Sequence, residues 1–149
     1  MTFKQKIYNQ YLQMQETKIN GLQQQLNDLK ESTANETKST AGDKYETARA
    51  MLQIEQDNTR RQLQDALEQQ SIFTTIDISI NSDEIIRGSL VKTNKGYLFI
   101  SVALGKILEE GTPIIALSPQ SPLGKQLMGL RVNDTTTINN IAYTIEQIQ

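Results

Sequence analysis

The chain has 149 residues, and its 15 basic and 17 acidic side chains give a formal net charge of −2. It contains no Cys and no His, which excludes disulfides, thiolate nucleophiles, imidazole bases and Cys/His zinc sites. Neither half is basic enough to bind free nucleic acid, because 9 basic and 10 acidic residues precede Ser71 and 6 and 7 follow. Carboxylates remain as reactive groups, and a protein is the expected partner.

Residues 3–34 are predicted to form a long helix, because they contain no Pro and a single Gly. Its inner positions recur at heptad spacing, in the two interleaved series Leu12, Ile19, Leu26 and Tyr8, Gln15, Leu22, Leu29. The segment from Glu31 to Gly42 is small and polar, which predicts a turn.

A second helix is predicted from Asp43 to Gln70. Its weaker apolar face consists of Tyr45, Ala48, Leu52, Thr59, Leu63, Ala66 and Leu67, and the polar residues Glu55, Gln56 and Asn58 interrupt it. Two helices of similar length joined by a short loop favour an antiparallel coiled-coil hairpin over residues 1–71, with its tip near 32–46. Because the partner helix is in the same chain, we expect a monomer.

After Ser71 the apolar pattern changes to the alternation of a half-buried strand. Strands are predicted at Phe73–Ile80, 85–93, 97–104, 112–117, 135–139 and 143–148, with hairpin turns at 94–96 and 139–140. Ser121 and Pro122 predict the N-cap and first position of a short helix that Gly129 ends. Residues 72–149 are therefore expected to form a small antiparallel sheet with one short helix, which makes the chain an α+β protein.

Residues 118–134 resemble the C-terminal signature of the Gre transcript-cleavage factors of bacterial RNA polymerase. The matching positions are Ser118, Ser121, Pro122, Leu123, Gly124, Leu127, Met128 and Asp134, whereas Gln126 and Asn133 depart from the pattern. Near the predicted tip, Asp43, Glu46 and Ala48 match the family's two acids and its alanine. Lys44, Tyr45 and Thr47 depart from the family's residues there.

The resemblance implies a coiled-coil hairpin followed by a domain of FKBP-like fold. In that family the hairpin enters the secondary channel of RNA polymerase, and its tip acids assist cleavage of the 3′ end of backtracked nascent RNA. Asp43 and Glu46 would share the Mg²⁺ of the polymerase active site, and Ser121, Pro122, Leu123 and Gly124 belong to the implied docking region. The chain would be an accessory factor with no enzyme activity and no cofactor of its own.

Simpler explanations exist for the same residues. Asp43 and Glu46 are spaced as a capping box at a helix start, and acids in a first turn are also favoured by the helix dipole. A basic face towards RNA or polymerase could be formed by Lys44, Arg49, Arg60 and Arg61, but a solvated helix face is favoured.

Two other functions are open. One is a Gre-fold regulator that occupies the channel without promoting cleavage, and the other is a coiled-coil adaptor or prolyl-isomerase-like module. The second half has few aromatic residues for an isomerase pocket. The sequence has no run of 18 apolar residues and no signal peptide, so no membrane association is expected. We therefore expect a cytoplasmic location.

Overall fold

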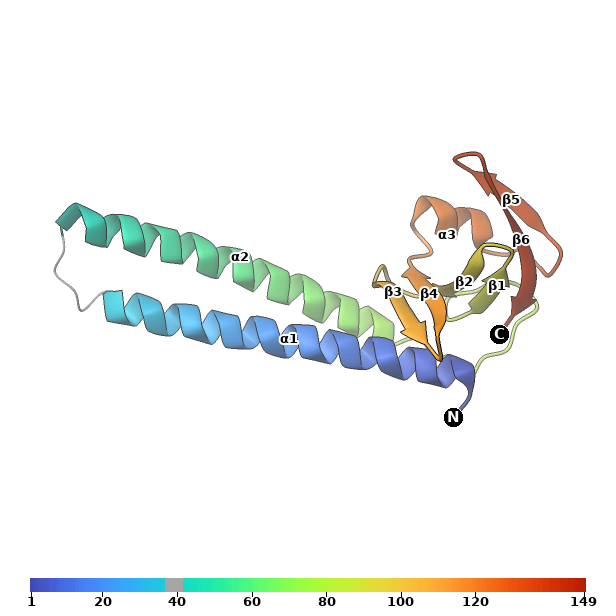
Figure 1. The fold of residues 1–149 in the computed structure, drawn as a ribbon, viewed down its shortest axis with the longest axis horizontal. Helices are drawn as coiled ribbons and strands as arrows, with labels where there is room; N and C mark the ends of the chain where they lie inside the picture. Colours follow the sequence, from blue (N-terminus) through green and yellow to red (C-terminus); the bar gives the residue numbers. More distant parts are fainter. Residues whose placement is uncertain (37–41) are drawn as a thin grey trace. The chain divides into compact units, whose positions relative to one another are not determined.

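The computed structural model describes the backbone of residues 1–36 and 42–149 and the side chains of residues 1–35 and 46–149. This part of the chain is α+β, with two long helices, a six-stranded mixed sheet and a short helix (Figure 1). The elements are α1 (Phe3–Glu36), α2 (Gly42–Thr74), β1 (Leu90–Thr93), β2 (Gly96–Ile100), β3 (Gly105–Glu109), β4 (Thr112–Leu117), α3 (Pro122–Leu127), β5 (Thr135–Ile138) and β6 (Ile141–Ile148). Neither long helix, over its described residues, has the apolar stretch that crossing a bilayer requires.

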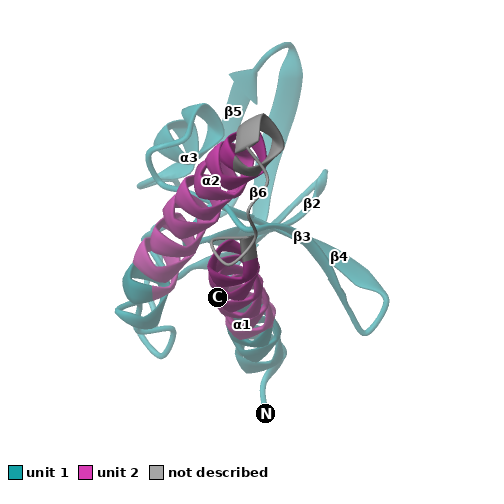
Figure 2. Cartoon of the chain, turned by 90° about the vertical axis from the view of Figure 1, so that its left-hand side faces the viewer, with its two compact units in different colours: residues 1–13, 71–149 teal, residues 14–70 magenta. Residues whose placement is uncertain are grey.

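The chain divides into two compact units (Figure 2). Unit 1 comprises residues 1–13 and 71–149, and unit 2 comprises residues 14–70. The join between residues 70 and 71 lies next to the boundary predicted at 71. The first 13 residues, expected to belong to the helical part alone, are part of unit 1.

The sheet of unit 1 has the strand order β3-β4-β2-β1-β6-β5. All neighbouring pairs are antiparallel except β2 and β4, which pair in parallel from Tyr97↔Ile114 to Ile100↔Leu117. The prediction of a purely antiparallel sheet was therefore wrong. The reason is β3, a strand that the sequence analysis missed: it carries the chain to the sheet edge, so that β4 returns in the direction of β2.

Each face of this sheet carries a cluster of buried residues within unit 1. On one face, Ile7 and Tyr11 from the start of α1 and Phe73 from the end of α2 pack on strand residues such as Phe99 and Ile114. On the other face, a second cluster contains Ile85, Val91, Leu98, Ile100, Leu117, Leu127 and Ile145. Residues far apart in the sequence thus build the first of these clusters, in which the beginning of α1 packs on a sheet face.

The strand predicted at Phe73–Ile80 was wrong, because α2 continues to Thr74 and no strand follows it before β1. Phe73 is fully buried in the last turn of α2. The Asp77 carboxylate then accepts hydrogen bonds from the backbone N–H of Ser79 at 2.9 Å and from its hydroxyl at 2.5 Å. Such a local turn competes with strand pairing. The alternation of apolar residues here reflects two separate turns.

The other predicted elements agree with the structure to different extents. The helix after Ser121, the strand at 112–117 and the last hairpin are confirmed, and Asn139 and Asn140 form its turn with φ of 51° and 65°. The strand predicted from residue 85 begins only at Leu90, and the one predicted to residue 104 ends at Ile100. α1 continues to Glu36, into the predicted turn, while residues 37–41 lie outside the described residues.

In unit 2 the heptad face predicted for α1 is buried from Gln15 through Ile19, Leu22 and Leu26 to Leu29. Ile19 and Leu22 cluster with Ala66 and with the partly buried Leu63 of α2. Two positions of α2 were assigned wrongly: Leu67, expected inside, is 46% exposed, and Gln56, expected to interrupt the apolar face, is buried.

Candidate functional site

The two acids singled out in the sequence lie in the first turns of α2. This helix begins at Gly42, so its backbone places Asp43 and Glu46 three residues apart. Residues spaced in this way share one helix face. The Glu46 side chain is exposed, whereas the side chain of Asp43, and with it the geometry of the pair, lies outside the described residues.

Further along α2 from these acids, polar contacts connect the two helices of unit 2. The Gln56 side-chain amide donates hydrogen bonds to the Leu29 carbonyl oxygen at 3.3 Å and to the Thr33 hydroxyl at 2.6 Å. Arg60 in turn donates to the Gln56 amide oxygen at 3.2 Å. These bonds join the final turns of α1 to α2 ten residues after Glu46, about 15 Å along the helix axis.

Glu46 borders a shallow depression on the surface of α2. The depression has a volume of about 430 Å³, and Arg49, Ala50 and Gln53 also line it. Their spacing of three, four and seven residues from Glu46 puts all of them on one side of the helix. The depression has one acidic and one basic side chain, so a group of either charge could bind there.

Arg60, one of the basic residues of α2, interacts with acidic and polar side chains of its own helix. Arg60 forms an ion pair with Asp57 at 3.2 Å, and both side chains are about half exposed. Together with its bond to Gln56, this pairing fits the solvated helix face considered above. Exposed pairs of this kind contribute about 0–1 kcal/mol to stability.

The second candidate region is the start of α3, where the predicted serine cap is confirmed. Ser121 adopts an extended conformation, its hydroxyl accepts a hydrogen bond from the Gly124 N–H at 3.0 Å, and it donates to the Ser118 carbonyl oxygen at 2.7 Å. Pro122, at the first helical position, has no N–H to leave unpaired. Of the implied docking residues, Pro122 is exposed, Ser121 and Leu123 are half-buried, and Gly124 is buried.

Gly124 has a steric role that the sequence did not reveal. A Cβ at this position would lie 2.0 Å from the Ser118 carbonyl oxygen and 3.0 Å from the Pro119 Cα. Both neighbours are backbone atoms and cannot swing aside. The small residue of the signature is thus required by the loop that precedes α3.

The last part of the signature closes a turn after α3. The Asp134 carboxylate accepts a hydrogen bond from the Arg131 N–H at 2.8 Å, and the Asp134 carbonyl oxygen accepts one from the Ile145 N–H at 2.9 Å. Gly129 has the positive φ, 83°, that commonly ends a helix. Several signature positions therefore stabilise the local structure of unit 1.

Sequence analysis missed the burial of a charged residue in unit 1, Lys4, which is 7% exposed. A signal for it exists, because Lys4 lies three and seven residues before Ile7 and Tyr11 and so falls on their buried helix face. The heptad pattern of α1 starts at Tyr8, one turn after Lys4.

No family model, curated protein or solved structure matches the chain.

Proposed function

We propose that the chain is a Gre-type accessory factor of RNA polymerase that stimulates cleavage of backtracked RNA. The observation that carries the proposal is an exposed carboxylate, Glu46, three residues after Asp43 in the first turns of a long helix. In this proposal the two helices form a coiled-coil hairpin, unit 1 is an FKBP-like docking domain, and a cytoplasmic monomer binds the polymerase.

The chemistry of the two acids is suited to this role. Mg²⁺ prefers hard oxygen ligands and is often held by one or two carboxylates together with phosphate oxygens. In phosphodiester hydrolysis such an ion supplies charge stabilisation and lowers the pKa of bound water. Asp43 is proposed as the metal ligand, and Glu46 as the group that orients the attacking water or shares the metal.

A cleavage assay on a stalled elongation complex with a labelled RNA 3′ segment tests the proposal. We expect Asp43→Asn and Glu46→Gln each to lower the stimulated cleavage rate by about 100-fold, the scale of losing one preorganised electrostatic group. The matched control is Glu55→Gln, which removes an exposed acid elsewhere on α2 and should leave the rate unchanged. Normal cleavage by both tip variants would refute the assigned role of the acids.

The second candidate is a channel-binding regulator that does not promote cleavage. The residues between and beside the two acids favour it, since Lys44, Tyr45 and Thr47 differ from those of the Gre family. Under this alternative the wild-type protein binds polymerase and slows elongation in the same assay, and no RNA fragment is released. Failure to bind polymerase at all would contradict both candidates.

A further inference from the structure

Lys4 is a largely buried residue whose ammonium group has no close partner among the described residues. Lys4 lies in the first turn of α1 and is 7% exposed. It forms no side-chain hydrogen bond or ion pair with any residue that the structure describes, and Asp77 acts on it only at longer range. Lysine is rarely buried unless it is paired, because removing its charge from water is costly.

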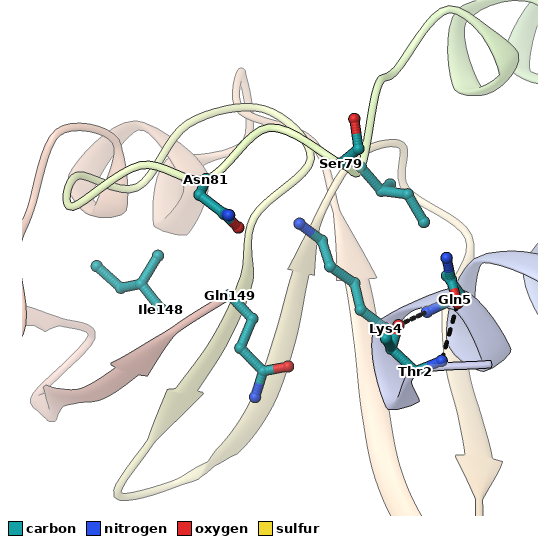
Figure 3. A pocket seen from close by; sticks show the side chains of 8 residues that line it. Thr2, Lys4, Gln5, Ser79, Asn81, Ile148 and Gln149 are labelled. Atoms are coloured by element: carbon teal, nitrogen blue, oxygen red, sulfur yellow. Dashed lines mark hydrogen bonds between the residues drawn. The ribbon is translucent and has the colours of Figure 1, made fainter.

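This ammonium points into a cavity of unit 1 (Figure 3). The cavity has a volume of about 420 Å³ and is bordered by the start of α1, the segment after α2 and the end of β6. Lys4 extends between Ser79 and Asn81, which come from the second of these segments. A volume of this size is within the usual range for small-molecule sites.

The groups around the ammonium are mainly neutral hydrogen-bonding groups. Thr2 and Gln5 form a capping box, with bonds of 2.8 and 3.1 Å between the backbone N–H of each and the side chain of the other. The side-chain amides of Asn81 and Gln149 donate to no described residue. The first turn of α1 also presents the positive end of a helix dipole, which favours anions.

The electrostatics of Lys4 favour the binding of an anion. Burial lowers the pKa of Lys4, and the attraction of Asp77 only partly opposes this shift. One carboxylate oxygen of Asp77 accepts both hydrogen bonds of Ser79, and no ion pair joins Asp77 to Lys4. An anion entering the cavity would supply the close opposite charge that Lys4 lacks.

We infer that this cavity is a binding site for a carboxylate, held by the Lys4 ammonium and by the side-chain amides of Asn81 and Gln149. A single ammonium matches a singly charged carboxylate better than a phosphate dianion, which proteins more often bind through Arg or several cations. The half-buried side chains of Ile78 and Ile148 give the same cavity an apolar wall that suits the carbon chain of such a ligand. This inference is independent of the proposed function.

The test is an NMR titration of the full-length protein, following the Lys4 side-chain signals and the Asn81 amide at constant ionic strength. The probes are acetate, succinate, a blocked aspartyl peptide and inorganic phosphate, with chloride as the baseline. We expect the carboxylates to give saturable shifts with dissociation constants of about 1–10 mM, and the pKa of Lys4 to rise when they bind. Saturation by acetate and succinate alone supports a free small molecule as the ligand, and saturation by the peptide supports an acidic side chain.

Two variants and a control separate binding from folding. Lys4→Met keeps the length and apolar stem of the side chain and should weaken carboxylate binding at least about tenfold. Asn81→Ala changes an exposed residue and should weaken it without affecting folding. Lys6→Met is the matched control, because Lys6 pairs with Glu110 at 2.6 Å and does not line the cavity. Tighter binding of phosphate, unsaturable shifts with every carboxylate, or unchanged binding by Lys4→Met would overturn the inference.

Discussion

Tyr11 links three elements of unit 1 through one side chain. It is fully buried, and its hydroxyl donates towards the carbonyl oxygens of Gly105, at 2.7 Å, and Ile114, at 3.1 Å. Its ring lies 6.1 Å from that of Phe99 and 6.5 Å from that of Phe73. The phenol therefore connects α1 to the first residue of β3 and to β4, and the ring adds apolar contacts to the same core.

Tyr11→Phe is expected to lower the free energy of unfolding by about 1–2 kcal/mol at neutral pH, because the buried Ile114 carbonyl and the partly buried Gly105 carbonyl lose a donor. Burial raises the pKa of Tyr11, while the backbone of Ala116 partly opposes the shift. A raised folded-state pKa means that this contribution is complete below the unfolded value of about 10 and is lost as pH rises above it. Denaturant unfolding between neutral pH and pH of about 11 should therefore show a smaller alkaline loss in the variant than in the wild type.

The control for this experiment is Tyr143→Phe, which removes a phenol from the half-buried surface of β6. Its free energy of unfolding at neutral pH should fall by less than that of Tyr11→Phe. Equal alkaline slopes for the wild type and Tyr11→Phe would show that the Tyr11 hydroxyl is not held in its neutral form by the fold.

At the level of elements, α3 depends on the loop that leads into it. The Ser121 cap and the Ser118 carbonyl oxygen leave no space at Gly124, where a Cβ would approach that oxygen to 2.0 Å. The same short helix places Leu127, which is fully buried, in the second core cluster of unit 1. A shift of the loop would therefore disturb the packing beneath it.

Gly124→Ala is expected to destabilise unit 1 by about 1–3 kcal/mol, the typical range of substitutions that force strain into a packed site. Lys125→Ala is the matched control on the next residue, which is exposed, and should change stability by less than about 0.5 kcal/mol. The measurement is denaturant unfolding, followed by the amide signals of the sheet. A cost for Gly124→Ala as small as that of the control would mean that the loop adjusts freely.

The elements that the sequence predicted well are those in which local chemistry decides the structure. Residues close together in the sequence determine three such features: the heptad of α1, the Ser121–Pro122 helix start and the Asn139–Asn140 turn. Gln56 and the segment after Phe73 show what was missed. Gln56 is buried because its amide reaches Leu29 and Thr33, 27 and 23 residues earlier, which no spacing rule detects.

For the candidate site, sequence reasoning placed Asp43 and Glu46 at a helix start, and the backbone of α2 agrees. It also found the serine cap of the docking region. It could not anticipate that Gly124 is required by a carbonyl oxygen six residues earlier, or that Lys4 faces a cavity built from three distant segments. Those features depend on where the folded chain brings backbone atoms and side chains.

At the level of the whole molecule, unit 1 is assembled from the two ends of the described sequence. Residues 1–13 contribute Ile7 and Tyr11, both fully buried, to a core whose other members follow residue 71. Burying two such side chains contributes about 1.5–3 kcal/mol each. The segment 72–149 by itself therefore lacks part of the core on one face of its sheet.

A chain of residues 72–149 alone is expected to be unfolded or strongly destabilised, since it loses about 3–6 kcal/mol of apolar burial. Replacing residues 14–70 by a short Gly/Ser linker keeps all of unit 1 and should restore cooperative folding. Amide dispersion in two-dimensional NMR and thermal unfolding of both chains provide the measurement. Folding of 72–149 with the same stability as the linked chain would show that residues 1–13 are dispensable.

The wide separation of the partners of Tyr11 also affects how the protein is made. Its hydrogen bond to Ile114 spans 103 positions. At about 5–20 residues per second, a ribosome needs about 5–20 s to synthesise that stretch. During this time Ile7 and Tyr11 have been synthesised but the strands that bury them have not. The nascent chain therefore exposes an amphipathic segment with an unburied apolar face. Unit 1 can therefore close only after its later strands have been synthesised, and chaperones can bind the early segment in the meantime.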